Sequence, residues 1–163
     1  MIVRPSSGLG AAERVLVITR VLNAPRELVF EAWTNPAHLR RWWGPKDYPA
    51  VQLDMDIRPG GIWRGCLRSV ADGRELWHKG VFREVVPPER LVFTFAWEEE
   101  GERGLETLVT VTFAQHAKGK TLMTLRHEPF QSAEEREGHR GGWDSAFHRL
   151  EGHLRPGAAS GSN

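Results

Sequence analysis

Two histidines occupy positions from which they could do chemistry. His139 lies on the apolar side of a helical pattern near the C-terminus, and His127 shares one face of a strand-like segment with Thr121, Met123 and Leu125. If both side chains point inward, they can bind the polar end of a ligand, or act as acid and base near neutral pH. The alternative that we favour is two histidines hydrogen-bonded within the wall of the protein. Two histidines without a third ligand do not indicate a zinc site, so no metal is expected.

The other polar motifs do not match familiar catalytic sites. The Gly-Lys-Thr segment 119–121 ends like a phosphate-binding loop, but Ala114 stands where that loop needs glycine, so the segment predicts a hairpin turn. The pair His127-Glu128 begins like a zinc-protease helix, but Gln131 replaces the second histidine. Nothing around Cys66 indicates a nucleophile, and there is no Gly-x-Ser-x-Gly turn. We therefore predict no catalytic residue and no cofactor. Four further histidines fall on expected exposed surfaces or turns: His38, His116, His148 and His153.

The composition limits the class of protein. A length of 163 residues with 40% hydrophobic and 26% charged residues suits one folded domain. A net charge of +1 gives no overall field to attract nucleic acid or an anionic membrane, so neither partner is expected. One cysteine excludes an internal disulfide, and no segment resembles a signal peptide or a membrane span, which fits a cytoplasmic protein. Seven tryptophans require much aromatic surface in a core, a pocket or an interface.

Most of the chain predicts one strand, two short helices and six further strands. Residues 14–22 are rich in β-branched side chains, and short helical patterns follow over 23–33 and 37–43. From residue 50 the period changes to two, with turn residues at 58–61, 72–73, 98–102 and 116–119. In the first of these strands the alternation places four side chains inward: Val51, Leu53, Met55 and Ile57. Of the adjacent Trp42 and Trp43, we expect one ring in the core and the other facing outward.

The last element is a long amphipathic helix. Ser132 and Glu135 have the spacing of a capping box, and one helical face then carries His139, Trp143, Ala146, Phe147, Leu150 and Leu154. Gly141 and Gly142 each cost the helix about 1 kcal/mol relative to alanine. We favour close packing against the sheet as their reason, with space for a ligand or an opening helix as the alternative. Residues 13–155 are expected to form a single domain, with a flexible N-terminus over 1–12 and a disordered tail over 156–163.

This order predicts an α+β fold in which one curved antiparallel sheet of about seven strands grips the C-terminal helix. Space between the sheet and an aromatic helix would be the usual place for an apolar ligand. Alternation places Trp97 and Phe113 on the inner face with several of the candidate ligand-binding residues. Those candidates are Trp63, Phe93, Phe95, Val109, Val111, Met123, Leu125, His127, His139, Trp143 and Phe147, with Arg64 a further group that could orient a polar end.

The chain resembles a known family in a series of short motifs that follow one another in the right order. They are Ala24-Pro25, Glu27-Leu-Val-Phe30, Trp33-Thr34-Asn-Pro36, Trp42-Trp-Gly-Pro45, Arg58-Pro-Gly-Gly61, Pro87-Pro-Glu-Arg-Leu91, Gly119-Lys-Thr121 and Gly142-Trp143. Together they resemble the activator-of-heat-shock-protein-90-ATPase-like family of the START-related SRPBCC superfamily, from about residue 15 to residue 154. The resemblance implies a helix-grip fold with a deep hydrophobic cavity between the sheet and the C-terminal helix.

The resemblance leaves three functions open. The first is binding of a small hydrophobic or amphipathic ligand in the cavity, which is the expectation that we prefer. The second is a cyclase-like or hydrolase-like enzyme that uses the same cavity. The third is a co-chaperone in the stress response that binds a heat-shock protein 90 homologue through its outer surface. A homodimer is a further possibility that the family suggests.

Overall fold

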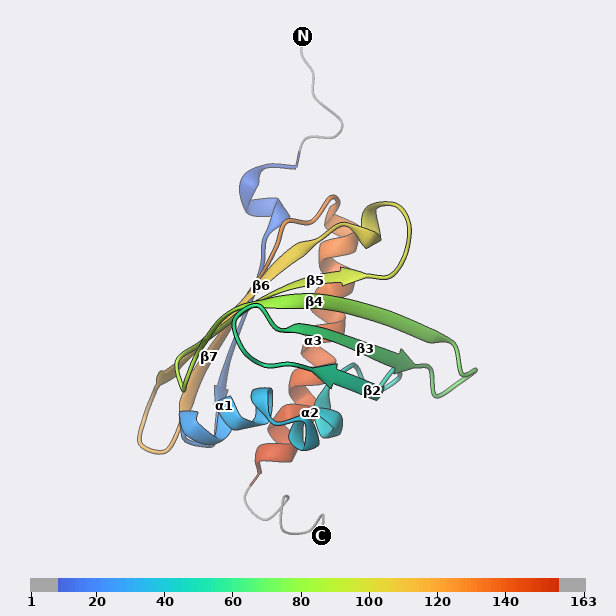
Figure 1. Ribbon diagram of the computed structural model, residues 1–163. Coiled ribbons are helices and arrows are strands. Elements are labelled where there is room, and N and C mark those ends of the chain that lie inside the picture. The colour runs from blue at the N-terminus through green and yellow to red at the C-terminus, as the bar shows by residue number, and fades with distance from the viewer. Residues whose placement is uncertain (1–8, 156–163) are drawn as a thin grey trace.

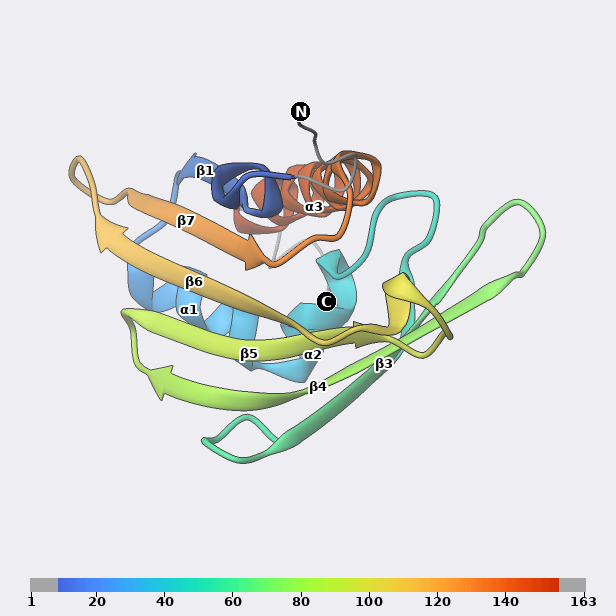
Figure 2. The same ribbon diagram turned by 90° about the horizontal axis from the view of Figure 1, so that it is seen from above.

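A curved antiparallel sheet wraps around one long helix. The computed structural model describes residues 9–155, and its seven strands lie in the order β1-β7-β6-β5-β4-β3-β2. Helix α3 (Ala133–Leu154) lies along the sheet, and α1 (Arg26–Thr34) and α2 (Pro36–Trp42) sit at one end of it (Figure 1). Viewed from above, the sheet bends around the space that these helices occupy (Figure 2). The predicted helix-grip α+β fold is confirmed.

The strands follow the predicted order. Their bounds are β1 (Leu16–Leu22), β2 (Ala50–Met55), β3 (Ile62–Arg68), β4 (Glu75–Val86), β5 (Arg90–Trp97), β6 (Thr107–Gln115) and β7 (Thr121–Glu128). Two short 3-10 helices, η1 (Ala11–Arg14) and η2 (Glu102–Gly104), precede β1 and follow β5. Part of the N-terminal segment predicted to be flexible thus belongs to η1. The predictions for residues 1–8 and for the tail 156–163 lie outside the described residues.

Local side-chain chemistry sets the ends of the elements. The Asn35 side chain accepts a hydrogen bond from the Ala37 amide and so caps α2, while Ser132 accepts one from the Glu135 amide and caps α3. In the turn between β2 and β3, the Gly61 amide donates to the Arg58 carbonyl, with Gly60 at φ +84°. This is the type II geometry that the sequence predicts, in which the third residue needs a positive φ.

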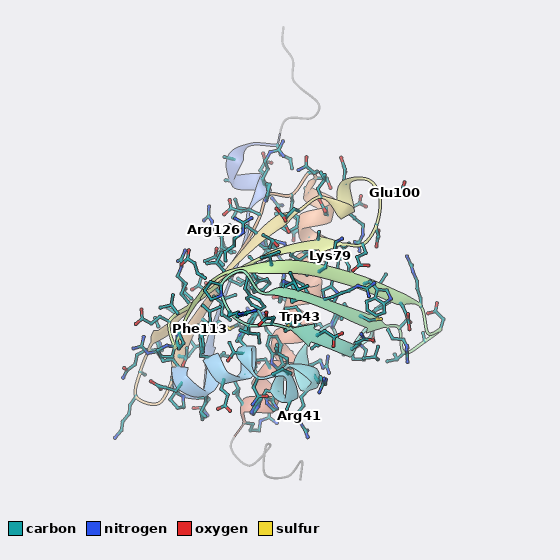
Figure 3. All side chains as sticks on the ribbon, in the orientation of Figure 1. Arg41, Trp43, Lys79, Glu100, Phe113 and Arg126 are labelled. Carbon is teal, nitrogen blue, oxygen red and sulfur yellow. The ribbon has the colours of Figure 1, made fainter. Side chains whose placement is uncertain are left out.

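Two predictions are wrong, one about the adjacent rings of Trp42 and Trp43 and one about the inward side chains of β2. Both Trp42 and Trp43 are buried, with 0% and 4% of their surfaces exposed, because the chain turns after α2 and carries Trp43 under α3. Figure 3 labels Trp43 near the middle of the molecule. In β2, Leu53 is buried but Val51 is 46% exposed. The reason is a shift of register between Ala50 and Gln52 on this edge strand, which breaks the alternation.

The core fills the space between the sheet and the three helices. It contains large side chains from every layer, among them Trp33 of α1, Trp42 of α2, Phe93 of β5 and Phe147 of α3. Within residues 9–155 no helix is both long enough and apolar enough to cross a membrane.

Candidate functional site

An aromatic pocket of about 220 Å³ opens between α3, the sheet and the loop that follows α2. The loop after α2 and strands β3, β4 and β5 form one side, the loop that contains η2 adds Arg103, and α3 forms the other side. The lining residues are Trp43, Gly44, Pro45, Tyr48, Leu67, Leu76, His78, Phe95, Trp97, Arg103, Gly138, His139, Gly142, Trp143 and Ala146. The pocket is thus a largely apolar space with few polar groups, as small-molecule sites usually are.

Three tryptophan–histidine hydrogen bonds lie in or behind the wall of this pocket. Trp43 Nε1 donates to His78 Nε2 at 2.8 Å, and Trp97 Nε1 donates to His139 Nε2 at 3.1 Å. Behind them, Trp143 Nε1 donates to His127 Nδ1 at 3.1 Å. An indole N–H can only donate, so each histidine nitrogen that faces one carries no proton.

His127 has both ring nitrogens engaged within the protein. Its Nε2 lies 2.7 Å from the Thr107 hydroxyl, which itself donates to the Phe95 carbonyl at 2.8 Å. Because the Thr107 proton is used in that way, His127 Nε2–H donates to Thr107, while Nδ1 accepts from Trp143. Burial, together with nearby His139, holds the pKa of His127 well below its usual value. The ring is therefore a neutral structural link between β7, β6 and α3.

His139 borders the pocket itself. Burial, and secondarily the positive charge of Arg103, lowers the pKa of His139 to about 4. Its ring packs edge-on against His127 with 4.9 Å between the ring centroids. The two inner histidines therefore lie side by side, but the lowered pKa of each opposes proton uptake near neutral pH. The arrangement favours the interpretation of two histidines hydrogen-bonded in a wall over an acid–base pair.

Charged side chains lie at the edge of the pocket and hold its loops. The Arg103 guanidinium stacks over the Trp97 ring at 4.7 Å and pairs with Glu99 at 3.0 Å. On the other side, Arg149 of α3 donates to the carbonyls of Trp43 at 3.1 Å and Gly44 at 2.7 Å. These bonds attach the loop after α2 to α3, and the loop thereby forms a fixed wall of the pocket.

Glycines of α3 leave space where side chains would fill the pocket. Gly138 and Gly142 line it, and a Cβ atom added to either, or to Gly141, would meet no atom within 4 Å. Close packing against the sheet, the explanation that we favoured for Gly141 and Gly142, is therefore wrong. Gly142 instead borders the pocket, in line with the alternative that it leaves space, whereas Gly141 is exposed and lies outside the lining.

The predicted ligand-binding residues divide into pocket lining and core. Phe95, His139 and Trp143 line the pocket. Two others, Trp63 and Phe93, border a separate internal space of about 10 Å³. The rest are buried in the core outside that lining: Val109, Val111, Met123, Leu125, His127 and Phe147. Contact of any of these residues with a ligand stays a prediction.

Two polar predictions need correction. Arg64 is exposed on β3, pairs with Glu98 at 2.6 Å and stacks on Trp77 at 4.0 Å, so it faces away from the pocket. Its position between Trp63 and Gly65, which face inward, explains this. His38 and His153 are half-buried rather than solvated, because His38 Nδ1 lies 2.8 Å from His153 Nε2 where α2 meets α3.

Sequence reasoning missed several lining residues. His78 is buried on β4, where its alternation with Leu76 and Phe82 is a signal that was present in the sequence. Tyr48 and Arg103 come from loops, in which no period indicates a direction. Among residues 9–155, no group of three or more His, Cys, Asp or Glu side chains is placed to hold a metal ion.

Comparisons with known proteins place the fold in a family. Residues 23–155 match the model of the family described as activator of Hsp90 ATPase homolog 1-like protein. This chain belongs to that family. No curated protein matches the chain. The activator of Hsp90 ATPase homolog 1-like match covers the sheet from β2 to β7, all three α-helices and every residue of the pocket lining.

Solved structures agree with this assignment. The AHSA1 protein SPO3351 from Silicibacter pomeroyi is 26% identical, with a TM-score of 0.76 over 86% of this chain and 96% of that one. Protein CV1439 from Chromobacterium violaceum is 25% identical, with a TM-score of 0.75 over 87% and 98%. Protein Ms6760 from Mycobacterium smegmatis, at 24% identity and a TM-score of 0.76 over 90% and 94%, shares the fold.

Proposed function

We propose that this protein binds a small hydrophobic or amphipathic molecule in the pocket between α3 and the sheet. The observation that carries the proposal is the open aromatic space of about 220 Å³, which the glycines of α3 leave unfilled. Each glycine within a helix lowers stability by about 1 kcal/mol relative to alanine. Helix α3 has two of them, Gly138 and Gly142, in the wall of the pocket, and open space for a ligand gives a reason for this loss of stability. Burial of apolar ligand surface, at roughly 25 cal/mol per Å², would supply the affinity.

Filling the pocket from α3 tests this proposal. Gly142→Leu places a side chain in the open space, whereas Gly141→Leu adds the same side chain to the exposed neighbouring position. We expect native mass spectrometry of the gently purified wild-type protein to show one bound small molecule. The same molecule should raise the melting temperature of wild type and of Gly141→Leu, because a ligand of the folded state stabilises it. The molecule should not change the melting temperature of Gly142→Leu.

The two leucine variants separate the pocket from the rest of the molecule. Circular dichroism should show that both remain folded, since neither added Cβ meets an atom within 4 Å. Equal ligand response in the two variants would place binding elsewhere. An empty protein that no member of a lipid and metabolite panel stabilises would overturn the proposal.

The family description supports a second candidate, a co-chaperone that binds a heat-shock protein 90 homologue. Action in the cytoplasm and during stress is a further part of this proposal. This function uses the outer surface and does not need the pocket. Capture of a purified heat-shock protein 90 homologue on the immobilised protein tests it. If Gly142→Leu captured the homologue as well as wild type does, the two functions would be independent. If no capture occurred, the co-chaperone candidate would fail.

A third candidate, an enzyme in the same pocket, has weaker support. It requires His127 and His139 to exchange protons with a ligand near neutral pH. His127 has both nitrogens bound by Trp143 and Thr107, and the pKa of His139 is lowered to about 4. The geometry therefore supports binding better than proton transfer.

A further inference from the structure

The hydrogen bonds of the pocket wall fix the tautomer of His139. Because Trp97 Nε1–H donates to His139 Nε2, the single proton of the neutral ring lies on Nδ1. That Nδ1–H has no hydrogen-bond partner among residues 9–155, while the side chain borders the pocket. His139 is therefore a donor whose proton is unused within the protein. His127, one ring away, holds the opposite tautomer because its Nδ1 accepts from Trp143.

A second histidine of the lining repeats the arrangement. His78 Nε2 accepts from Trp43 Nε1–H at 2.8 Å, so its proton also lies on Nδ1. That Nδ1 is fully buried and makes no hydrogen bond of good geometry, although the Gly65 backbone interacts with the ring. A buried donor without a partner is unfavourable by about 1–3 kcal/mol. The wall of the pocket thus contains one unused N–H group that borders the open space, on α3, and a second, poorly satisfied one buried behind it on β4.

The side chains of the lining offer almost no acceptor in return. Its polar side chains are His78, His139, Arg103, Tyr48 and the three indoles, and each indole N–H is already bound to a histidine. Arg103 has only donors. The Tyr48 hydroxyl is the one side-chain group of this lining that has a free acceptor, and no carboxylate or amide side chain is present. A ligand that carries an acceptor can therefore satisfy the His139 donor, which no side chain of the lining does.

We propose that the pocket selects a planar aromatic or conjugated molecule with a carbonyl oxygen, which accepts a hydrogen bond from His139 Nδ1–H. The rings of Trp43, Tyr48, Phe95, Trp97 and Trp143 supply flat apolar surfaces for such a molecule. The lining supplies no carboxylate to pair with a cationic ligand, and the nearest charged group is the Arg103 guanidinium, which is itself positive and already paired with Glu99. This inference rests on the proposed ligand-binding function and adds the chemical class of the ligand.

A set of shape-matched probes tests the inference. Methyl naphthyl ketone carries the carbonyl, isopropenylnaphthalene replaces its oxygen by a CH2 group of similar shape, and naphthylethylamine replaces the acceptor by a cation. Titration calorimetry with wild-type protein should give the ketone about fivefold higher affinity than the alkene, the usual effect of one hydrogen bond. The amine should bind more weakly than either. Equal binding of ketone and alkene would overturn the inference and leave the proposed function standing. Failure of all three probes to bind would overturn the inference alone if a lipid or metabolite still stabilises the protein, and both proposals would fail if none does.

Two variants of His139 test whether the preference for the ketone over the alkene depends on the Nδ1 donor. His139→Asn places an amide nitrogen near the position of Nδ1 and keeps a donor there. His139→Gln places its amide near Nε2, keeps the bond with Trp97 and removes the Nδ1 donor. We expect the ketone preference to persist in His139→Asn and to vanish in His139→Gln. The reverse pattern would contradict the assignment. If a variant fails to fold, the wild-type comparison of ketone and alkene still decides.

The tautomers can also be observed directly in the intact protein. Long-range proton–nitrogen NMR spectra at neutral pH should show the Nδ1–H form for His139 and the Nε2–H form for His127. An Nε2–H form of His139 would overturn the inference, because its free nitrogen would then be an acceptor.

Discussion

His139 shows how one hydrogen bond fixes the protonation state of a side chain in this pocket. A tryptophan N–H aimed at a ring nitrogen stabilises the neutral histidine, because the charged form would place a second proton at that nitrogen. The same contact recurs at His78 and His127. Burial is the largest cause of the lowered pKa in all three rings. They therefore act as fixed hydrogen-bonding groups at neutral pH.

These neutral histidines make stability depend on pH. In the unfolded chain each ring takes up a proton near its usual pKa of about 6.5, whereas in the folded protein burial lowers the pKa to about 3 at His78 and about 4 at His139. The unfolded state thus binds more protons below about pH 6.5, and stability falls as the pH falls. We expect each of these two histidines to lower the free energy of unfolding by about 2 kcal/mol between about pH 7.5 and pH 5. Urea denaturation at a series of pH values measures it.

The control is His116, which is exposed in the turn before β7. His116→Gln should leave the pH dependence unchanged, and His139→Asn should reduce it by the share of one histidine. Carboxylates with lowered pKa values, such as Glu98 and Glu75, lose their contribution mainly below about pH 4.5, so the two effects separate. A flat stability profile between pH 7.5 and pH 5 would show that the histidines are not held neutral.

At the scale of elements, α3 and the loop after α2 act together to form the pocket. Gly138 and Gly142 leave the helix side open, and Arg149, two turns after Gly142, fixes the loop that closes the other side. Arg149 also donates to the Arg41 carbonyl at 3.0 Å. In addition, the Lys46 amide donates to the Ser145 hydroxyl at 2.9 Å. Contacts with α3 therefore fix the loop after α2, which carries Trp43 and forms one wall of the pocket.

Arg149→Met should loosen this wall. The substitution keeps an unbranched apolar stem but removes hydrogen bonds to three carbonyl groups, those of Trp43 and Gly44 in the loop and that of Arg41 at the end of α2, so we expect a loss of about 2 kcal/mol in stability. Hydrogen exchange should become faster in residues 43–50, and denaturant unfolding measures the loss. Arg140→Met is the matched control on the same helix, because within residues 9–155 the ion pair of Arg140 is with exposed Glu137, and the change should alter stability by less than about 0.5 kcal/mol. Equal effects would show that Arg149 does not hold the loop.

Across the whole molecule, one aromatic cluster joins every layer. The ring of Trp33 in α1 lies within 4.8 Å of Trp42 in α2 and 6.2 Å of both Phe113 in β6 and Trp143 in α3, measured between centroids. Loss of any one layer therefore exposes rings of the others. The chain has one core and no second one that could survive alone among the residues that the structure describes.

We expect the protein to unfold in a single cooperative transition. Tryptophan fluorescence reports the cluster and far-ultraviolet circular dichroism reports the sheet and helices, and their urea unfolding curves should coincide. Coincidence follows because the same rings hold α1, α2 and α3 against the sheet. A fluorescence change at lower urea than the dichroism change would contradict it, since α3 or the loop after α2 would then open independently.

Much of this fold could be predicted from local patterns. The period of two in Phe93, Phe95, Val109 and Val111 places these side chains on the inner face, and all four are buried. Caps and turn glycines, such as Ser132 and Gly60, act through neighbouring residues and are equally visible. The edge strand β2 was less predictable, because the bulge at residues 50–52 depends on how β3 pairs with it.

The sequence by itself determined the order of elements, the inward faces of the central strands and the family resemblance, because periods, caps and turns act over a few residues. Only the tertiary structure decided which inward side chains border open space. Phe95 and Val109 both face inward, yet Phe95 lines the pocket and Val109 does not, because the open space lies beside β3, β4 and β5 and does not reach β6. The tautomer of His139 was likewise decided by Trp97, a partner 42 residues away in the chain. The sequence alone does not show that residues so far apart are in contact, because the fold brings them together.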